Sequence, residues 1–253
     1  MRVFSIFVLS LLAACTGNGF PEKSKSKLGM SDWAQKENKD PKTQPGYIDK
    51  ADAQNQVVND KKEGKWLEYI DGNERATADT LIAFYKVSIY NKGIPTGISR
   101  IYYNDGTLYR ETPYTDGEKN GMEKEYHENG QLSSEYPFTA GKINGLAKGY
   151  YWSGKLNYEA PYSDGEEDGV EKMYYENGVL KGVRPYTKGK ENGIEIWYYP
   201  NGKTGAELPF LNGWLNGVKK EYYENGKLKS EITFVNGHMG VFKKFDENGN
   251  EIK

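Results

Sequence analysis

Cysteine, histidine and excess positive charge are all scarce in this sequence of 253 residues. Cys15 is the single cysteine, so no disulfide can form within the chain. The two histidines, His127 and His238, lie far apart in the sequence and provide no cluster with metal-ligand spacing. The 34 Lys and Arg residues are offset by 36 Asp and Glu, whereas a nucleic-acid surface needs a strong local excess of positive charge. We therefore expect no metal, no cofactor and no nucleic acid.

The first residues of the chain are typical of an export signal. Met1-Arg2 is followed by an apolar run from Val3 to Leu12, which is too short to span a bilayer, and then by Ala13-Ala14-Cys15. The Leu-Ala-Ala-Cys ending resembles a bacterial lipobox, and the resemblance implies cleavage before Cys15 and lipidation of that residue. The alternative is a plain signal peptide with an incidental cysteine. We expect a lipoprotein signal peptide at residues 1–14 and attachment to the membrane through lipid.

A polar segment follows the lipobox. Residues 15–62 are rich in Lys, Ser, Gln, Asn, Asp and Pro and show no sustained period, so they are predicted to form a flexible tether. The stretch from Ile48 to Asn59 could instead make a short helix. Thr16, in place of an acidic residue after Cys15, favours the outer membrane, with the chain facing the periplasm or the cell surface.

Glycine, in contrast, is abundant, with 30 copies, and three sets of glycines recur at one interval of 24 residues. The set that begins at Gly97 continues through Gly121 to Gly217, and two further sets keep step with it. A fixed period of this length is typical of a repeat array whose units stack on their neighbours. Repeats are expected to begin at residues 96, 120, 144, 168, 192 and 216, between a degenerate copy at 63–95 and a partial copy at 240–253.

Each repeat contains two runs of alternating polar and apolar residues separated by Asn-Gly or a relative, which is a strong hairpin signal. No stretch shows the helical period. The predicted fold is therefore all-β, an elongated single-layer antiparallel β-meander of tandem 24-residue hairpin repeats preceded by a disordered tether. In the repeat at 120, strands are expected at about Met122 to His127 and Gln131 to Phe138.

The turn between these strands has two possible forms. A two-residue turn at Asn129-Gly130 places Lys124 opposite Glu135 and divides the apolar residues between both faces. A three-residue turn places Tyr126 opposite Leu132, and we expect Met122, Tyr126, Leu132 and Phe138 to share one face in that case. The three-residue turn is favoured because it gathers the apolar residues on one side. In either case, the prolines at 113, 137, 161, 185 and 209 are expected at a bulge or beyond the end of pairing.

Tyrosines form two columns along the predicted sheet. The first column is expected to be structural, while the second points to the opposite face, where amphipathic rings are well suited to binding. Cross-strand packing without a ligand is the alternative. Two tryptophans, Trp152 and Trp197, depart from the repeat pattern and join the candidates for a specific contact. The candidate binding residues are therefore Tyr103, His127, Tyr151, Trp152, Tyr175, Trp197, Tyr199 and Tyr223.

The pattern YYxNGxL, repeated together with a spaced YxxGxxxG, resembles the variant MORN repeat of YwqK-type antitoxin proteins from about Lys61 to Lys253. The resemblance implies an interaction module of successive β-hairpins with no catalytic residues. It also implies a partner toxin, although the lipobox predicts a location outside the cytoplasm. Choline- or glucan-binding wall repeats share the aromatic pairs, but they rely on tryptophans at fixed positions, which this chain lacks.

From these patterns we expect a protein that is not an enzyme and has no small-molecule substrate. The leading hypothesis is a lipid-anchored protein of the bacterial cell envelope that presents a tyrosine-rich repeat surface to another protein, such as an envelope component. Two alternatives are an antitoxin or immunity protein that neutralises a toxin by binding, and a module that binds cell-wall glycan.

Overall fold

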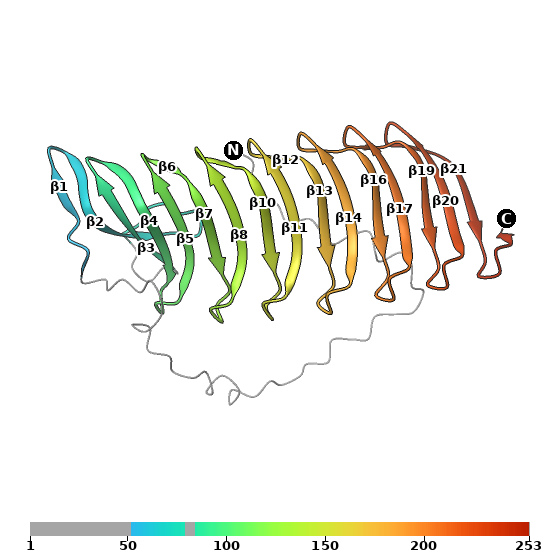
Figure 1. The fold of residues 1–253 in the computed structure, drawn as a ribbon, viewed down its shortest axis with the longest axis horizontal. Coiled ribbons are helices and arrows are strands. Elements are labelled where there is room, and N and C mark those ends of the chain that lie inside the picture. The colour runs from blue at the N-terminus through green and yellow to red at the C-terminus, as the bar shows by residue number, and fades with distance from the viewer. Residues whose placement is uncertain (1–51, 79–83, 253) are drawn as a thin grey trace, which may run out of the picture. The chain divides into compact units, whose positions relative to one another are not determined.

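The computed structural model describes residues 52–78 and 84–252, which belong to one compact unit, Asp40–Lys253. The predicted signal peptide, Cys15 and most of the predicted tether lie outside the described residues. Among those described, the strands form one antiparallel sheet of 22 members and no α-helix occurs (Figure 1). No helix in this described part has the length and hydropathy needed to cross a membrane.

Three strands precede the regular repeats. They are β1 (Gln56–Val58), β2 (Lys61–Ile70) and β3 (Phe84–Asn91). The β1 strand lies where the sequence allowed a short helix, and β2 begins two residues before the predicted start of the degenerate copy. The ten extra residues of that copy fall between β2 and β3, after Gly72.

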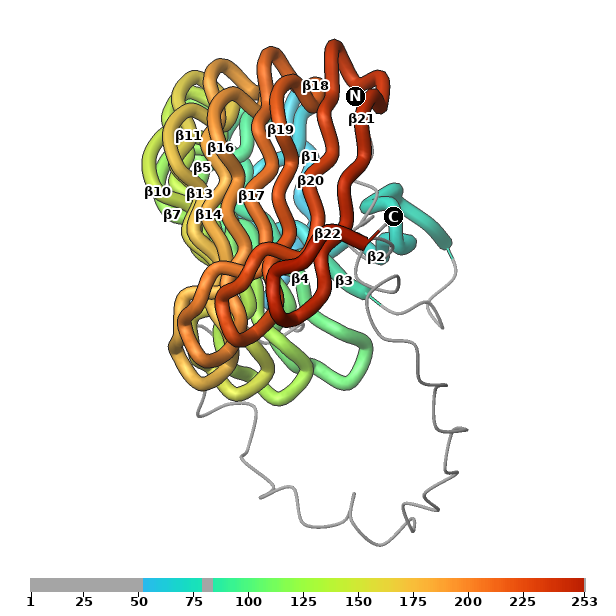
Figure 2. Tube along the Cα trace, turned by 90° about the vertical axis from the view of Figure 1, so that its right-hand side faces the viewer, coloured from blue at the N-terminus to red at the C-terminus, as the bar shows by residue number. Residues whose placement is uncertain are grey.

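The regular hairpins follow one after another. Their strands are β4 (Ile94–Tyr103), β5 (Leu108–Thr115), β6 (Glu118–Lys119), β7 (Gly121–Tyr126), β8 (Leu132–Thr139), β9 (Lys142–Ile143), β10 (Gly145–Tyr150), β11 (Leu156–Ser163), β12 (Glu166–Glu167), β13 (Gly169–Tyr174), β14 (Leu180–Thr187), β15 (Lys190–Glu191), β16 (Gly193–Tyr198), β17 (Thr204–Leu211), β18 (Trp214–Leu215), β19 (Gly217–Tyr222), β20 (Leu228–Val235), β21 (His238–Phe245) and β22 (Glu251–Ile252). Figure 2 shows successive hairpins one behind another, with their turns aligned. The meander of hairpin repeats is thus confirmed.

The hairpin turn has the predicted three-residue form. Tyr126 lies opposite Leu132, and the turn is closed by hydrogen bonds from His127 N to Gln131 O and from Gly130 N to His127 O, each 2.8 Å long. Gly130 has a φ of +81°, which explains why glycine recurs at this position. The same arrangement occurs in the other hairpins; for example, Tyr174 lies opposite Leu180.

A β-bulge directly after this pair corrects one predicted face. Ser133 is the extra residue, so Glu125 pairs with Ser134, and Lys124 pairs with Glu135 as the two-residue turn required. Phe138 consequently lies opposite Gly121 and not on the face of Met122 and Tyr126, as we expected from the turn alone. A bulge adds one residue to one strand only. The residues of β8 after Ser133 therefore point to the opposite faces from those that the three-residue turn alone would give.

The two faces of the sheet differ in regularity. We call the face that bears Met122, Lys124 and Tyr126 the periodic face, because equivalent residues recur in nearly every repeat. The opposite face, which bears Glu123, Glu125 and their equivalents, is the variable face. Most of the buried side chains of the array lie on the variable face: Ser99, Thr112, Glu123, Ser134, Ala147, Ala160, Glu195 and Ser230.

The prolines mark the connections between repeats. Pro137 lies in β8. On the side of the next repeat, Phe138 and Thr139 pair with β9, and Ser134 and Glu135 pair with β10, but Pro137 and the residue before it are unpaired. Its carbonyl accepts the N–H of Asn144 at 2.8 Å, and its ring packs on Gly145, where an added Cβ would lie 3.1 Å from the proline Cγ. The prediction that the prolines sit at interruptions of pairing is therefore confirmed, and Gly145 is required by close approach as well as by its φ of +121°.

Candidate interaction surface

The candidate site residues of the second tyrosine column begin the hairpin turns. Each of them directly follows the last residue of a strand, except Tyr103, which is the last residue of β4, and its backbone closes the turn. At Tyr175, for example, the N–H donates to Val179 O and the carbonyl accepts from Gly178 N, both at 2.8 Å. The backbone of this column is therefore held rigidly, one copy per repeat.

The hydroxyls of this column tie each repeat to the next. Tyr175 donates its hydroxyl hydrogen to Tyr198 O at 2.7 Å, and three other tyrosines of the column make the same bond to the following repeat. His127 occupies the same place, with Nε2 3.1 Å from Tyr150 O. These rings are half-buried. The second tyrosine column thus connects the repeats, which is the structural role given above as the alternative to binding. Because the hydroxyls are already bonded, only the faces of the rings are available to a partner.

Tyr103 begins the column in a different environment. Its ring lies 5.3 Å from that of Phe84 and 5.4 Å from that of Tyr109, and Phe84 is itself 5.3 Å from Tyr109. The three rings form one cluster beside the longest ladders of the sheet, which join β2, β3 and β4. Tyr103 is therefore packed against neighbours of its own chain.

Trp152 is the most exposed residue of the candidate set, with 56% of its surface accessible. Its ring lies 5.0 Å from that of His127, and its carbonyl accepts a hydrogen bond from Asn129 Nδ2 at 3.0 Å. Both partners belong to the preceding hairpin. The tryptophan is thus held in place while much of its ring stays in solvent.

Trp197 lies on β16 and faces the variable side of the sheet. It pairs with Gly182, where an added Cβ would come within 3.1 Å of the indole ring, so the glycine makes room for it. Lys181 Nζ lies 5.9 Å from the Trp197 ring and 5.7 Å from the Tyr175 ring, and the Arg184 guanidinium lies 5.9 Å from Trp197. Cations over aromatic faces therefore connect Trp197 with the tyrosine column.

The structure thus brings the predicted site residues together along one edge of the variable face, next to the hairpin turns. We call this set the aromatic row: Tyr103, His127, Tyr151, Trp152, Tyr175, Trp197, Tyr199 and Tyr223.

A charged cluster adjoins the aromatic row at Arg184. Its guanidinium meets three carboxylates at 2.7 to 3.4 Å, and they belong to Glu171, Glu191 and Glu195. Burial raises the pKa of Glu171 and of Glu191, and the opposing effect of Arg184 does not cancel it. One cation for three carboxylates leaves this part of the variable face acidic.

The first tyrosine column lies on the periodic face and ties the repeats in the opposite direction. Tyr150 donates its hydroxyl hydrogen to Glu135 of the preceding repeat at 2.8 Å, and Tyr126 does the same to Glu111 at 3.1 Å. Burial and the hydrogen bond to Glu135 raise the pKa of Tyr150 to about 12. The two columns therefore link every repeat to both of its neighbours.

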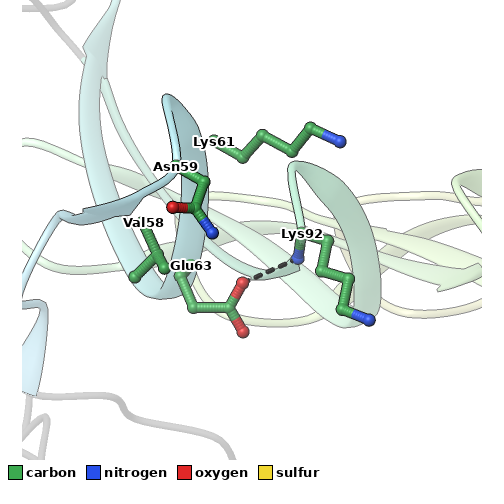
Figure 3. A pocket seen from close by; sticks show the side chains of 5 residues that line it. All are labelled: Val58, Asn59, Lys61, Glu63 and Lys92. Atoms are coloured by element: carbon green, nitrogen blue, oxygen red, sulfur yellow. Dashed lines mark hydrogen bonds between the residues drawn. The ribbon is translucent and has the colours of Figure 1, made fainter.

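No enclosed reaction site is evident among the described residues. A shallow polar hollow lies at the β1–β2 turn, where Glu63 Oε2 accepts the backbone N–H of Lys92 at 2.7 Å (Figure 3). Its other lining residues are Val58, Asn59 and Lys61. Within the described ranges, no group of three His, Cys, Asp or Glu residues is arranged to hold a metal ion.

An exposed aliphatic row on the periodic face was not among the predicted site residues, although Met122 was expected to share a face with Tyr126. The position directly after the first glycine of each repeat is always aliphatic, and these side chains are 39% to 64% exposed. The signal was present in the sequence as a column of seven aliphatic residues, but only the structure shows that they are exposed. The members are Ile98, Met122, Leu146, Val170, Ile194, Val218 and Val241.

Comparison with known protein families finds a match to a repeat family. The family model described as MORN repeat variant matches six consecutive segments that together make up slightly more than half of the chain: 95–116, 119–140, 143–164, 167–188, 191–212 and 215–236. Each segment corresponds to one hairpin of two long strands. No curated protein sequence matches the chain.

Proposed function

The chain belongs to the MORN repeat variant family, and we propose that it is a lipid-anchored envelope protein that binds another protein through the aromatic row. Within the family, the recurring YYxNGxL pattern supports a closer relation to the YwqK-type proteins. The repeats alone do not distinguish among partners, so the proposal depends on the surface that departs from the repeat.

The observation that carries this proposal is the exposed and fixed indole of Trp152. Tryptophan, tyrosine and arginine are the residues that contribute most to binding at protein interfaces, and the aromatic row gathers the first two beside Arg184. Because the turn backbone and the hydroxyl ties already order these rings, binding costs little additional side-chain entropy. A variable face also allows recognition of one partner, whereas a strictly periodic face offers the same contact at every repeat.

The proposed anchor is supported by the sequence from Met1 to Cys15. Several acyl chains on one residue hold a protein firmly at a membrane, and residues up to 51 provide the length for the array to stand away from it. Metabolic labelling with a radioactive fatty acid tests the anchor. We expect incorporation into the chain and none into the Cys15→Ser variant; label retained by that variant would refute lipidation at Cys15.

Photo-cross-linking in cells tests the binding surface. A photoreactive phenylalanine analogue in place of Trp152 should give a cross-link to a different protein, and the same analogue at the exposed turn residue Asp164 is the control. Tyr175→Phe should keep this partner because the ring remains, whereas Tyr175→Ala should weaken binding. Equal products from both photoreactive positions, or no protein adduct at all, would refute the proposal.

The identity of the recovered partner separates the alternatives. A toxin whose activity the chain suppresses would make the protein an antitoxin or immunity protein. Retention of the chain by purified cell-wall glycan without any protein partner would instead indicate a glycan-binding module.

A further inference from the structure

The middle of the periodic face carries one continuous row of alternating charges that crosses the sheet perpendicular to its strands. Each member is paired with the next across neighbouring strands. In order along the sheet, the row is Arg100, Glu111, Lys124, Glu135, Lys148, Glu159, Lys172, Val183, Ile196, Glu207, Lys220, Glu231 and Lys243. We call it the charged row.

The alternation is interrupted at one place only in this row, where Val183 and Ile196 stand side by side. Val183 takes the position of a glutamate and Ile196 that of a lysine. The two apolar residues adjoin the exposed aliphatic row, in which Val170 is 46% and Ile194 is 54% exposed. The interruption therefore widens the aliphatic row into an apolar patch in the array.

The charged row is complementary to itself about this interruption. Counting strands outward from the midpoint between Val183 and Ile196, Lys172 on one side is as far away as Glu207 on the other. The next equidistant positions also carry opposite charges, as Glu159 with Lys220 and Lys148 with Glu231 do. A two-fold rotation about an axis along the strands at this midpoint would thus bring each lysine of the row from Lys148 to Lys243 onto a glutamate of a second copy.

The same rotation also matches the aliphatic row. From Ile98 to Val218, each residue of the exposed aliphatic row pairs within its hairpin with a proline or, at Val218, with Thr233. About the same axis, Ile194 would lie over Pro185 of the second copy and Val170 over its Pro209. An aliphatic side chain of one copy then meets a proline of the other copy at each of these positions. Such contacts between side chains of different shape allow the two sheet faces to interdigitate.

We propose that two copies of this chain associate through their periodic faces, with the two-fold axis running along the strands between Val183 and Ile196. An isologous contact of this kind uses one surface twice, so each Lys172–Glu207 pair occurs two times. An axis displaced by half a strand spacing brings like charges together. An axis displaced by a whole spacing places Ile196 on Glu207 and Val183 on Lys220, so only the stated axis satisfies both rows.

Packed sheets lie about 10 Å apart, with strand directions rotated by about 30°. The charged pairs nearest to the axis therefore meet best, and Lys172–Glu207 is the pair most suited to a test. The apolar patch provides the attraction, while the charges set the register and exclude other arrangements. This contact uses the face opposite to the aromatic row and does not depend on the partner proposed above.

Zero-length carbodiimide cross-linking of the full chain in its own membrane tests the contact. Within one chain, Lys172 and Glu207 are three strand spacings apart, about 14 Å, which is too far for an amide bond between them. Peptide mass spectrometry should therefore find a Lys172–Glu207 link only in a species of twice the chain mass. Absence of this link, or a link from this face to another protein, would overturn the proposal.

Charge exchange provides a second test, read by sedimentation of the full chain in detergent. Lys172→Glu and Glu207→Lys should each weaken dimerisation at least about tenfold, because each creates two like-charge contacts. The double variant should recover dimerisation to within about threefold, although its neighbours within the chain still face like charges. Lys142→Glu, an exposed change outside the charged row, is the control and should have no effect.

The outcomes of this second test are decisive in both directions. Recovery in the double variant supports the two-fold contact, since a merely structural effect of either charge would add and not cancel. A chain that is monomeric throughout, a dimer insensitive to both single changes, or a double variant as weak as the singles would overturn it. None of these results depends on the partner that cross-links at position 152.

Discussion

At the scale of residues, the two tyrosine columns stabilise the array by different hydrogen bonds on opposite faces. The first column donates to glutamates of the preceding repeat, as at Tyr150 and Glu135. The second donates to backbone carbonyls of the following repeat, as at Tyr175 and Tyr198. Because a single-layer sheet has little interior, these bonds supply contacts between repeats that a thick core provides in other folds.

The interruption at Val183 offers a matched pair of tyrosines. Tyr150→Phe removes a hydrogen bond to a carboxylate and should lower the free energy of unfolding by about 1 kcal/mol. Tyr198→Phe should change it by less than about 0.5 kcal/mol, because Val183 replaces the glutamate and the described residues offer the Tyr198 hydroxyl no hydrogen bond. Urea unfolding of both variants measures the difference; equal losses would show that the hydroxyl ties contribute nothing.

In the charged cluster around Arg184, removing the charge of Glu171 is predicted to stabilise the folded chain by an amount that depends on pH. The pKa of Glu171 is raised in the folded chain, so its favourable contribution is complete below the ordinary glutamate pKa, and it is lost as the pH rises through the raised value. Glu171→Gln should therefore raise the melting temperature at neutral pH and have little effect near pH 4. Glu166→Gln, at an exposed position of the short strand β12, should change neither. A loss of stability at neutral pH would show that the Arg184 contact outweighs the cost of burial.

At the scale of elements, the bulged hairpin is the unit that decides which side chains share a face. The three-residue turn pairs Tyr126 with Leu132, and the extra residue Ser133 then exchanges the faces of the rest of β8. This exchange moves Phe138 to the variable face and places Glu135 beside Lys124. The charged row keeps one register along the sheet because the same bulge recurs in successive hairpins, as at Met173/Tyr174 in the second repeat after this one.

Deleting Ser133 tests the role of the bulge. The deletion removes the unpaired residue but leaves Ser134 opposite Glu125 and Glu135 opposite Lys124, so the two faces keep their side chains. Only the bulge and the twist that it adds are lost, and we expect a loss of about 1 kcal/mol or more from the free energy of unfolding. Ser133→Ala keeps the length and should cost less than about 0.5 kcal/mol. Chemical denaturation followed by tryptophan fluorescence measures both. A deletion that is as mild as the substitution would mean that the bulge itself does not stabilise the hairpin.

At the scale of the whole molecule, the described residues form an array in which each hairpin contacts mainly the hairpins before and after it (Figure 1). Stability in such an array is approximately a sum over units and the contacts between neighbours. Equivalent connections recur at every junction, as where Gly141 N donates to Lys119 O and Gly165 N donates to Ile143 O. One junction can therefore substitute for another.

Removal of one complete unit follows from this equivalence. Deleting residues 144–167 joins Ile143 to Asp168, which has the same place in its repeat as Asn144, so the shorter chain should fold and unfold cooperatively. Deleting residues 144–155 joins unlike positions and should abolish cooperative unfolding. Circular dichroism during heating compares the two. If both deletions unfold the array equally, the repeats do not act as separate units.

The sequence alone was sufficient to predict the period, the strands and the turns. The Asn-Gly turn, the alternation within each strand and the interval of 24 residues act over short distances and recur in every copy. The candidate rings were also identified from their column, and the structure gathers them along one edge. The anchor at Cys15 stays a prediction, because it lies outside the described residues.

Only the tertiary structure decided what each face carries. Whether Phe138 shares a side with Tyr126 depends on one extra residue, and Asn-Gly spacing does not reveal a bulge at Ser133. The tyrosine hydroxyls look available in the sequence, but stacking brings most of them to a carbonyl 23 residues away or to a carboxylate 15 residues away, as at Tyr175 and Tyr150. The charged row likewise links strands that no local pattern connects, because it is formed by the register between repeats.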